Sequence, residues 1–200
     1  FRQDSNFRYF AGINQPGLAL IIDADTGQST LYGDNLSLDD IVWMGEHPSI
    51  QELAQKVGIE QTASSADLKT RLAGSPQKVH YLPPYRDQRT RQLQSLLGLD
   101  WTSAGLSSPK RDSSASIDLI KAVVALRSIK STEEIEQLEV AINTTRQMHH
   151  AAMEQARPGM LESEVAGLIE GIAISGGGRL SYPAIVTKNG HILHNHDHSN

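Results

Sequence analysis

The chain has 200 residues, a formal net charge of −5 and a pI near 5.9, which excludes the extended basic surface that attracts nucleic acids or anionic membranes. Hydrophobic residues make up 38% of the chain and charged residues 20%, a balance typical of a globular protein rather than a disordered one. Cysteine is absent, so disulfides and thiolate chemistry are excluded, and no apolar run approaches the roughly 20 residues that span a bilayer. We expect a cytoplasmic protein without nucleic-acid or membrane partners.

The chain up to residue 125 is predicted to form an α/β domain, with a mixed sheet and flanking helices. Apolar stretches bounded by turn residues predict its strands at residues 7–13, 18–23 and 29–33. Serine caps and helical spacing predict its helices at residues 38–45, 49–57 and 65–72. Short apolar runs such as residues 78–84 complete the alternation of strands and helices expected of such a sheet.

The next part of the chain is predicted to be helical. Apolar residues at helical spacing indicate a connecting helix over residues 117–131. Ser131, followed by acidic residues, predicts the start of a long helix that ends at Arg157-Pro158-Gly159. A second amphipathic helix is expected over residues 162–174, where a triple glycine follows.

The last residues carry a predicted β-hairpin and the densest group of ionisable side chains. Asn189-Gly190 predicts the turn between two strands. The second strand would hold His194, His196 and His198 on one face, because alternate side chains of a strand point the same way. Such a face is typical of a metal-binding tip and equally of a solvated strand end, so both interpretations stay open.

Neither end of the chain looks like a natural terminus. The sequence begins with Phe1 rather than methionine, and residues 192–200 end without a helix cap or a polar tail. We therefore expect a fragment cut at both ends, with one complete domain and part of another.

Four motifs occur in order through the second half of the chain. They are LR-x-x-K-S-x-x-E-I at residues 126–135, R-P-G-M-x-E at residues 157–162, Y-x-x-I-V at residues 182–186 and L-H at residues 193–194. This series closely resembles the creatinase, prolidase and aminopeptidase P family of "pita-bread" metallopeptidases. Residues 1–17 and the IVWMG segment at residues 41–45 also resemble the N-terminal domain of aminopeptidase P, which favours this branch over prolidase or creatinase.

The resemblance implies that residues 1–125 form the aminopeptidase P type of N-terminal domain, and that residues 126–200 form the first half of an α+β pita-bread catalytic domain. It also implies a metal-dependent aminopeptidase that cleaves proline-containing peptides ahead of the proline, and a homo-oligomer in the full-length protein. The family's two divalent ions, with manganese favoured over cobalt or zinc, are held by aspartates, a histidine and glutamates downstream of residue 200. This chain would therefore hold no metal and be inactive alone.

Carried over by position, the resemblance implies that His194 is the active-site histidine, which contacts substrate or stabilises the transition state without binding metal. An imidazole suits this role because its pKa near neutrality lets it donate to an oxyanion or transfer a proton. Tyr182 and Ile185 would line the approach to the site, and Trp43 would reach the active site of a neighbouring subunit. The alternatives are a solvated loop histidine at position 194 and ordinary packing at the other three positions.

Three other functions stay open. The fold is also used by non-catalytic modules that bind peptides or proteins, and the full-length sequence would reveal one by the absence of the metal ligands. Within the enzymes, a prolidase cleaves only Xaa-Pro dipeptides, and a creatinase uses no metal. The third alternative is that the histidine-rich end of the chain scavenges metal ions. This function requires tight zinc or nickel binding by the chain that is lost when His196 and His198 are replaced.

Overall fold

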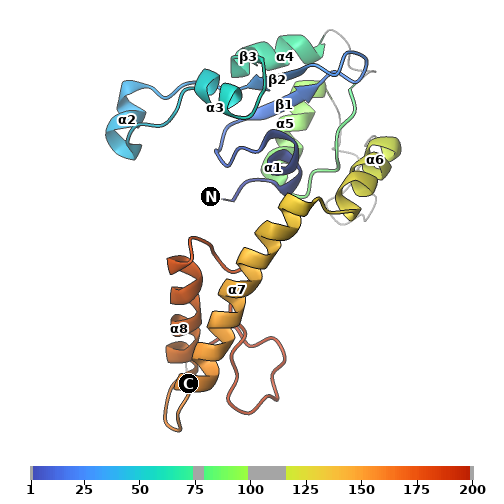
Figure 1. The fold of residues 1–200 in the computed structure, drawn as a ribbon. Helices are drawn as coiled ribbons and strands as arrows, with labels where there is room; N and C mark the ends of the chain where they lie inside the picture. Colours follow the sequence, from blue (N-terminus) through green and yellow to red (C-terminus); the bar gives the residue numbers. More distant parts are fainter. Residues whose placement is uncertain (1, 74–78, 99–115, 199–200) are drawn as a thin grey trace. The chain divides into compact units, whose positions relative to one another are not determined.

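The computed structural model describes residues 2–73, 79–98 and 116–198. The chain divides into two compact units, Phe1–Ala122 and Val123–Asn200 (Figure 1). The first unit contains a small sheet with helices, and the second is built on helices and a long irregular segment. The fold class is therefore as expected, an α/β domain followed by the start of a second domain. The boundary after residue 125 stays a prediction.

The sheet of the first unit is mixed, as predicted. Strand β1 (Ala19–Ile22) pairs antiparallel with β2 (Ser29–Tyr32), and β2 pairs in parallel with β3 (Gln61–Ala63). The turn between β1 and β2 is closed by the carboxylate of Asp23, which accepts the N–H groups of Asp25 and Thr26 at 3.0 Å each. Parallel pairing needs a crossover, and helix α3 (Ile50–Lys56) lies within it.

The core of the first unit lies where this sheet meets its helices. Besides α3, these helices are α1 (Ser5–Ala11), α4 (Ser65–Ala73) and α5 (Asp87–Leu97). The buried side chains form one cluster: Ala11, Ile13, Leu18, Leu31, Ile50, Ala54 and Ile59. Leu31 is 0% exposed. Asp34, just after β2, accepts the Ser65 N–H at 3.0 Å and so joins the sheet to the start of α4.

The predicted strand at residues 7–13 is wrong, because this segment lies mostly in helix α1. The Asp4 carboxylate accepts the N–H groups of Asn6 at 2.8 Å and Phe7 at 3.1 Å, which caps the helix. Gly12 then ends it with a left-handed φ of 68°. The aromatic residues favour a strand, but the cap and the glycine decide the local structure.

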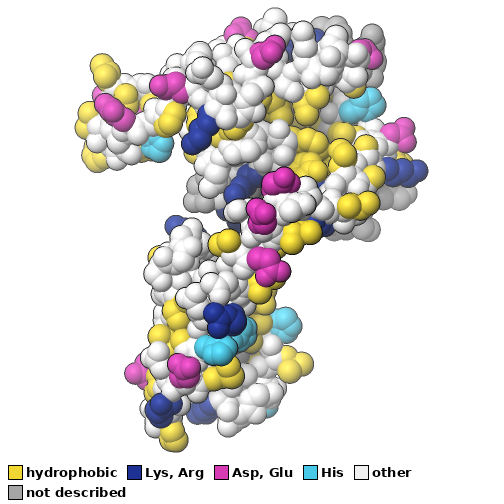
Figure 2. Space-filling view, in the orientation of Figure 1, with side chains coloured by type: hydrophobic (Ala, Val, Ile, Leu, Met, Phe, Trp, Pro, Cys, Tyr) yellow, Lys and Arg dark blue, Asp and Glu magenta, His cyan; other side chains and the backbone are white. Residues whose placement is uncertain are grey.

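Helix α2 (Leu38–Met44) projects from the first unit (Figure 1). It begins where predicted, at Ser37, whose hydroxyl accepts the Asp40 N–H while the Asp40 carboxylate accepts the Ser37 N–H. Figure 2 shows hydrophobic side chains gathered on this helix. We call its exposed apolar side chains the α2 apolar surface: Leu38, Val42, Trp43 and Met44.

The second unit begins within α6 (Ile117–Ser128), and its body is a pair of helices that pack on each other, α7 (Thr132–Gln155) and α8 (Glu162–Ser175). Ser131 caps α7 as predicted. Near the end of α8, a Cβ on Gly176 would lie 2.9 Å from Thr144 Cγ2, so the two helices approach closely there. In the described part of the chain, no helix is long and apolar enough to cross a membrane.

The predicted β-hairpin around Asn189-Gly190 is wrong. Residues 179–198 form an irregular segment, which we call the C-terminal loop, and none of them pairs as a strand. Gly190 does turn the chain, with a φ of 62°, but the loop bonds to side chains instead of a facing strand. Residues 79–84 are not a strand either, because Pro83 and Pro84 have no N–H for a ladder. Residue 78 lies outside the described residues.

Gly33 lies against the core, directly after β2. A Cβ added there would lie 2.5 Å from Leu18 Cδ2 and 2.7 Å from Ile50 Cδ1. Because both side chains are buried, we expect Gly33→Ala to lower the free energy of unfolding by about 1–3 kcal/mol, measured by urea denaturation. The control is Gly171→Ala in α8, where nothing lies within 4 Å of the new Cβ. It should be neutral or stabilising by up to about 1 kcal/mol. Equal stability of Gly33→Ala and the parent would contradict this packing.

Asp34 gives the fold a pH dependence. The backbone N–H of Ser65, and then its side chain, hold the pKa of Asp34 below its usual value. A lowered pKa in the folded state stabilises the fold above the unfolded-state pKa of about 3.9, and this stabilisation is lost as the pH falls through the folded pKa. We expect Asp34→Asn to unfold at a lower temperature than the parent at about pH 7, and this difference to shrink as the pH falls through the lowered pKa of Asp34 in the folded state, followed by circular dichroism. A difference that is constant over this range would show that the charge of Asp34 is not the cause.

Candidate functional site

The C-terminal loop is held to the start of α8 by one buried carboxylate. Glu162, the first residue of α8, is 5% exposed. Its Oε1 accepts a hydrogen bond from Lys188 N at 2.7 Å, and its Oε2 accepts one from Asn195 Nδ2 at 2.6 Å. The free N–H groups at the start of a helix also favour a negative charge at this place. One side chain therefore fixes two separate parts of the loop.

Asn195 joins the last part of the loop to its middle. Its Nδ2 also donates to Val186 O at 2.8 Å, and its Oδ1 accepts the Asp197 N–H at 3.3 Å. Beside it, His196 Nδ1 lies 3.3 Å from the carbonyl oxygen of Ala184, which is a buried residue. Side-chain bonds to the backbone thus take the place of the ladder that a hairpin would have.

Three of the predicted site residues lie on this loop. His194 directly precedes Asn195, and its side chain is exposed. Tyr182 and Ile185 lie near the start of the loop, and Tyr182 is 68% exposed. Trp43 lies in the other unit, on the α2 apolar surface, with 87% of its side chain exposed. Neither Tyr182 nor Trp43 is buried among the described residues, and surface packing stays an alternative for Trp43.

In the described residues, the loop histidines do not gather into a metal site. The expectation that His194, His196 and His198 share one face is wrong, because it required a strand. Across residues 2–73, 79–98 and 116–198, no three His, Asp or Glu side chains lie close enough together to hold a metal ion. Nε2 of His198 is buried and has no hydrogen-bond partner among the same residues. These side chains do not fit a two-metal centre.

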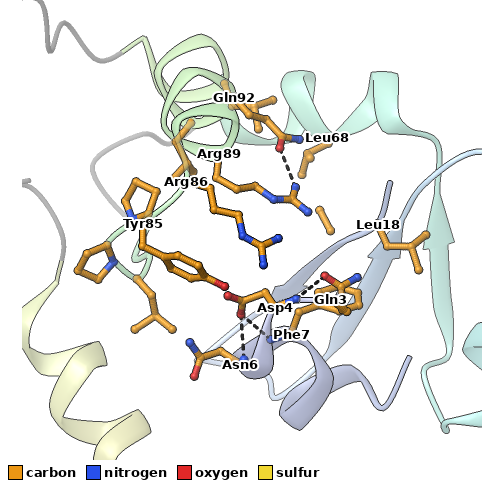
Figure 3. Close-up of a pocket in the computed structure, with 16 residues that line it drawn as sticks. Gln3, Asp4, Asn6, Phe7, Leu18, Leu68, Tyr85, Arg86, Arg89 and Gln92 are labelled. Carbon is orange, nitrogen blue, oxygen red and sulfur yellow. Dashed lines mark hydrogen bonds between the residues drawn. The ribbon is translucent and has the colours of Figure 1, made fainter. Parts of the chain in front are cut away.

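A cavity of about 260 Å³ opens in the first unit (Figure 3). The guanidinium of Arg86 lies 5.3 Å from the centre of the Tyr85 ring and donates to Arg2 O at 3.3 Å. Figure 3 shows Tyr85 pointing toward Asp4, whose carboxylate already caps α1. These groups hold the segment before α5 against the N-terminal residues, which is a structural role. None of the predicted site residues lines the cavity.

The sequence did not reveal Glu162 and Asn195 as partners. Glu162 stands in the R-P-G-M-x-E motif, but an acidic residue in the first turn is expected of any helix. Asn195 lies 33 residues further along the chain, and nothing local marks it. The one signal in the sequence is that Asn195, with an amide side chain, directly follows the candidate histidine.

Two family matches cover this architecture. Residues 1–80 match the N-terminal domain of aminopeptidase P, and residues 136–200 match metallopeptidase family M24. Together they cover more than two thirds of the chain, in the order that its motifs predict. The chain belongs to the aminopeptidase P family. Trp43 lies in the N-terminal match, and Glu162 and the described C-terminal loop lie in the metallopeptidase match.

Curated relatives in this family include both exopeptidase types. The Xaa-Pro aminopeptidase of Escherichia coli K12 is 28% identical over an alignment 203 residues long. The alignment covers 97% of this chain and 46% of the relative. The human Xaa-Pro dipeptidase is 27% identical over 178 residues, which cover 89% of this chain and 35% of the relative. The chain thus spans less than half the length of these relatives.

Solved structures of the family have the same fold. A zinc-substituted E. coli aminopeptidase P in complex with product shares 27% identity with a TM-score of 0.67, over 88% of this chain and 41% of that one. The proline aminopeptidase P II from Yersinia pestis, at 23% identity, has a TM-score of 0.70 over 88% of this chain and 42% of its own. The second likeness supports the fold alone.

Proposed function

We propose that the chain is part of a metal-dependent Xaa-Pro aminopeptidase, which hydrolyses the bond between an N-terminal residue and a following proline. The observation that carries the proposal is the match of residues 136–200 to a metallopeptidase family, behind an aminopeptidase P N-terminal domain. The aminopeptidase relative aligns with nearly the whole chain. A cytoplasmic location belongs to the same proposal and agrees with a sequence without cysteine.

Two divalent ions, with manganese favoured, are part of this proposal and are held by residues outside this chain. Such ions polarise a carbonyl and lower the pKa of bound water. Support comes from the metallopeptidase match and from zinc in a related structure. The contribution of this chain is the C-terminal loop rather than the ligands, so we propose that the 200 residues alone are inactive.

His194 is proposed as the catalytic histidine of the enzyme. Contact with a substrate requires an accessible side chain, and the imidazole of His194 is exposed while the next residue is fixed to α8. An imidazole donates to a developing oxyanion or moves a proton near neutral pH. Tyr182 and Ile185, on the same loop, are proposed to line the approach of the peptide.

In the full-length protein, we expect His194→Ala to lower kcat for a peptide with proline in second position about 10²- to 10⁴-fold, with a smaller change in KM. Chromatography of the released amino acid measures the rate. His191→Ala, which changes another exposed histidine of the same loop, is the control and should keep the parent's rate. A parent-like kcat in His194→Ala would contradict the catalytic role of His194.

The proposed inactivity of the 200-residue chain has its own test. Metal-dependent release of the residue before proline by this chain alone would contradict it.

A second candidate is an Xaa-Pro dipeptidase, favoured by the human relative that aligns with 89% of this chain. The two activities differ in the length of the peptide that they accept. Assays of the full-length protein on Xaa-Pro dipeptides and on longer peptides with the same first residues separate them. Hydrolysis of the longer peptides supports the aminopeptidase. A protein that cleaves neither substrate would be the non-catalytic binding module.

Trp43 is proposed to reach the active site of a neighbouring copy in a homo-oligomer. The α2 apolar surface supports this proposal, because a group of large exposed apolar side chains marks an interaction surface. Burial of such side chains against a partner stabilises the contact by about 25 cal/mol per Å² of apolar area. Four of the seven residues of this helix are large, apolar and exposed.

We expect Val42→Asp to shift the full-length protein to a smaller species, because a charge would be buried in the contact between copies. Light scattering after size-exclusion chromatography measures the mass. Met153→Asp places the same charge at an exposed apolar position of α7 and should leave the mass unchanged. An unchanged mass in Val42→Asp would show that α2 is not part of the contact.

Trp43→Ala should raise KM for the peptide, because Trp43 is proposed to reach the active site of the neighbouring copy.

A further inference from the structure

Among the described residues the C-terminal loop has no strand pairing, and Glu162 is the side chain that bonds it to the start of α8. Both oxygens of this carboxylate are used, one by a backbone N–H of the loop and one by the Asn195 amide. Hydrogen bonds to an ionised acceptor are shorter and stronger than those between neutral groups. The carboxylate is also buried, so its loss would take away the acceptor that Lys188 N and Asn195 Nδ2 share on α8.

Asn195 passes this constraint on to His194. Its side chain bonds at the same time to Glu162, to Val186 O and to the Asp197 N–H. The first bond holds the side chain of residue 195 to α8, and the other two hold it to the rest of the loop. The peptide bond between residues 194 and 195 is planar, so the Cα and the carbonyl group of His194 are held next to this anchored residue, while His194 itself stays exposed.

We propose that Glu162 is the positioning residue of the active-site loop and that it acts on His194 through Asn195. This inference rests on the proposed aminopeptidase function and adds the group that sets the place of its histidine. Glu162 is too buried to touch a substrate, so it contributes geometry rather than chemistry. Geometry is decisive here, since a misplacement of about 1 Å can cost about 10²-fold in rate.

Glu164 is a matched control on the same turn of α8. Its carboxylate accepts the Leu161 N–H at 2.7 Å, a bond at the start of its own helix. It is an exposed residue, and this bond lies outside the loop. Glu162→Gln and Glu164→Gln therefore remove the same charge from the same helix start, but only the first removes it from the loop.

The test compares these two variants in the full-length protein. Glutamine keeps the size of glutamate but has one acceptor oxygen, and its NH₂ group would face a donor of the loop. We expect Glu162→Gln to lower kcat at least about tenfold with little change in KM, and Glu164→Gln to leave both unchanged. Amide hydrogen exchange by mass spectrometry should show lost protection at residues 184–197 only in Glu162→Gln.

A double variant separates positioning from general stability. In the His194→Ala background, Glu162→Gln should cause no further loss in kcat, because the group that it positions is gone. A further loss of about tenfold there would overturn the inference, and so would a parent-like kcat in Glu162→Gln alone.

Asn195→Ala repeats the comparison if Glu162→Gln does not fold, because it removes the link to His194 while Glu162 keeps its bond from Lys188. The same kcat loss, again absent in the His194→Ala background, is expected, and a parent-like kcat would overturn the inference. A full-length parent without peptidase activity would defeat the proposed function, and the exchange data would then decide whether Glu162 orders the loop.

Discussion

A buried carboxylate has to accept hydrogen bonds from the protein, because it has lost those from water. In the second unit, the buried carboxylate of Glu162 accepts them from the C-terminal loop. The start of α8 supplies a favourable field, and the loop supplies two donors. The helix pair beneath is held at close range where Gly176 meets Thr144. The loop that carries His194 is therefore attached to the start of α8, although none of its described residues joins a sheet.

The first unit is stabilised in another way, by an apolar core with hydrogen-bonded links at its edges. Leu31 occupies the centre of the sheet, and the strand that contains it is followed by two polar anchors. Asp34 accepts the Ser65 N–H, and Asn35 accepts the Ile50 N–H at 2.8 Å. Both bonds join the segment before α2 to a segment after it. The two ends of the projecting helix are therefore connected to the rest of the first unit.

What the sequence predicted correctly is what local chemistry decides. Ser37, Ser49 and Ser131 each begin a helix, since a hydroxyl cap acts within three residues. Apolar stretches bounded by turn residues predict β1 and β2. The wrong strand at residues 7–13 also has a local cause, the Asp4 cap and the turn at Gly12. The wrong hairpin has a long-range cause, because the backbone of the C-terminal loop bonds to a side chain 26 residues earlier in the chain. Motif resemblance suggested His194, whereas Glu162 emerges only from the fold. The role of each residue is still a proposal.

Helix α2 has only seven residues, fewer than the roughly 12 that an isolated helix needs to be stable in water. Its helical form depends on the Ser37 cap and on the anchored segments at its two ends. The conformational entropy that remains in such a short element is lost when a partner covers it, and that loss offsets part of the gain from burying Trp43. A contact through α2 would therefore combine a specific shape with modest affinity, so that copies of the protein could exchange partners.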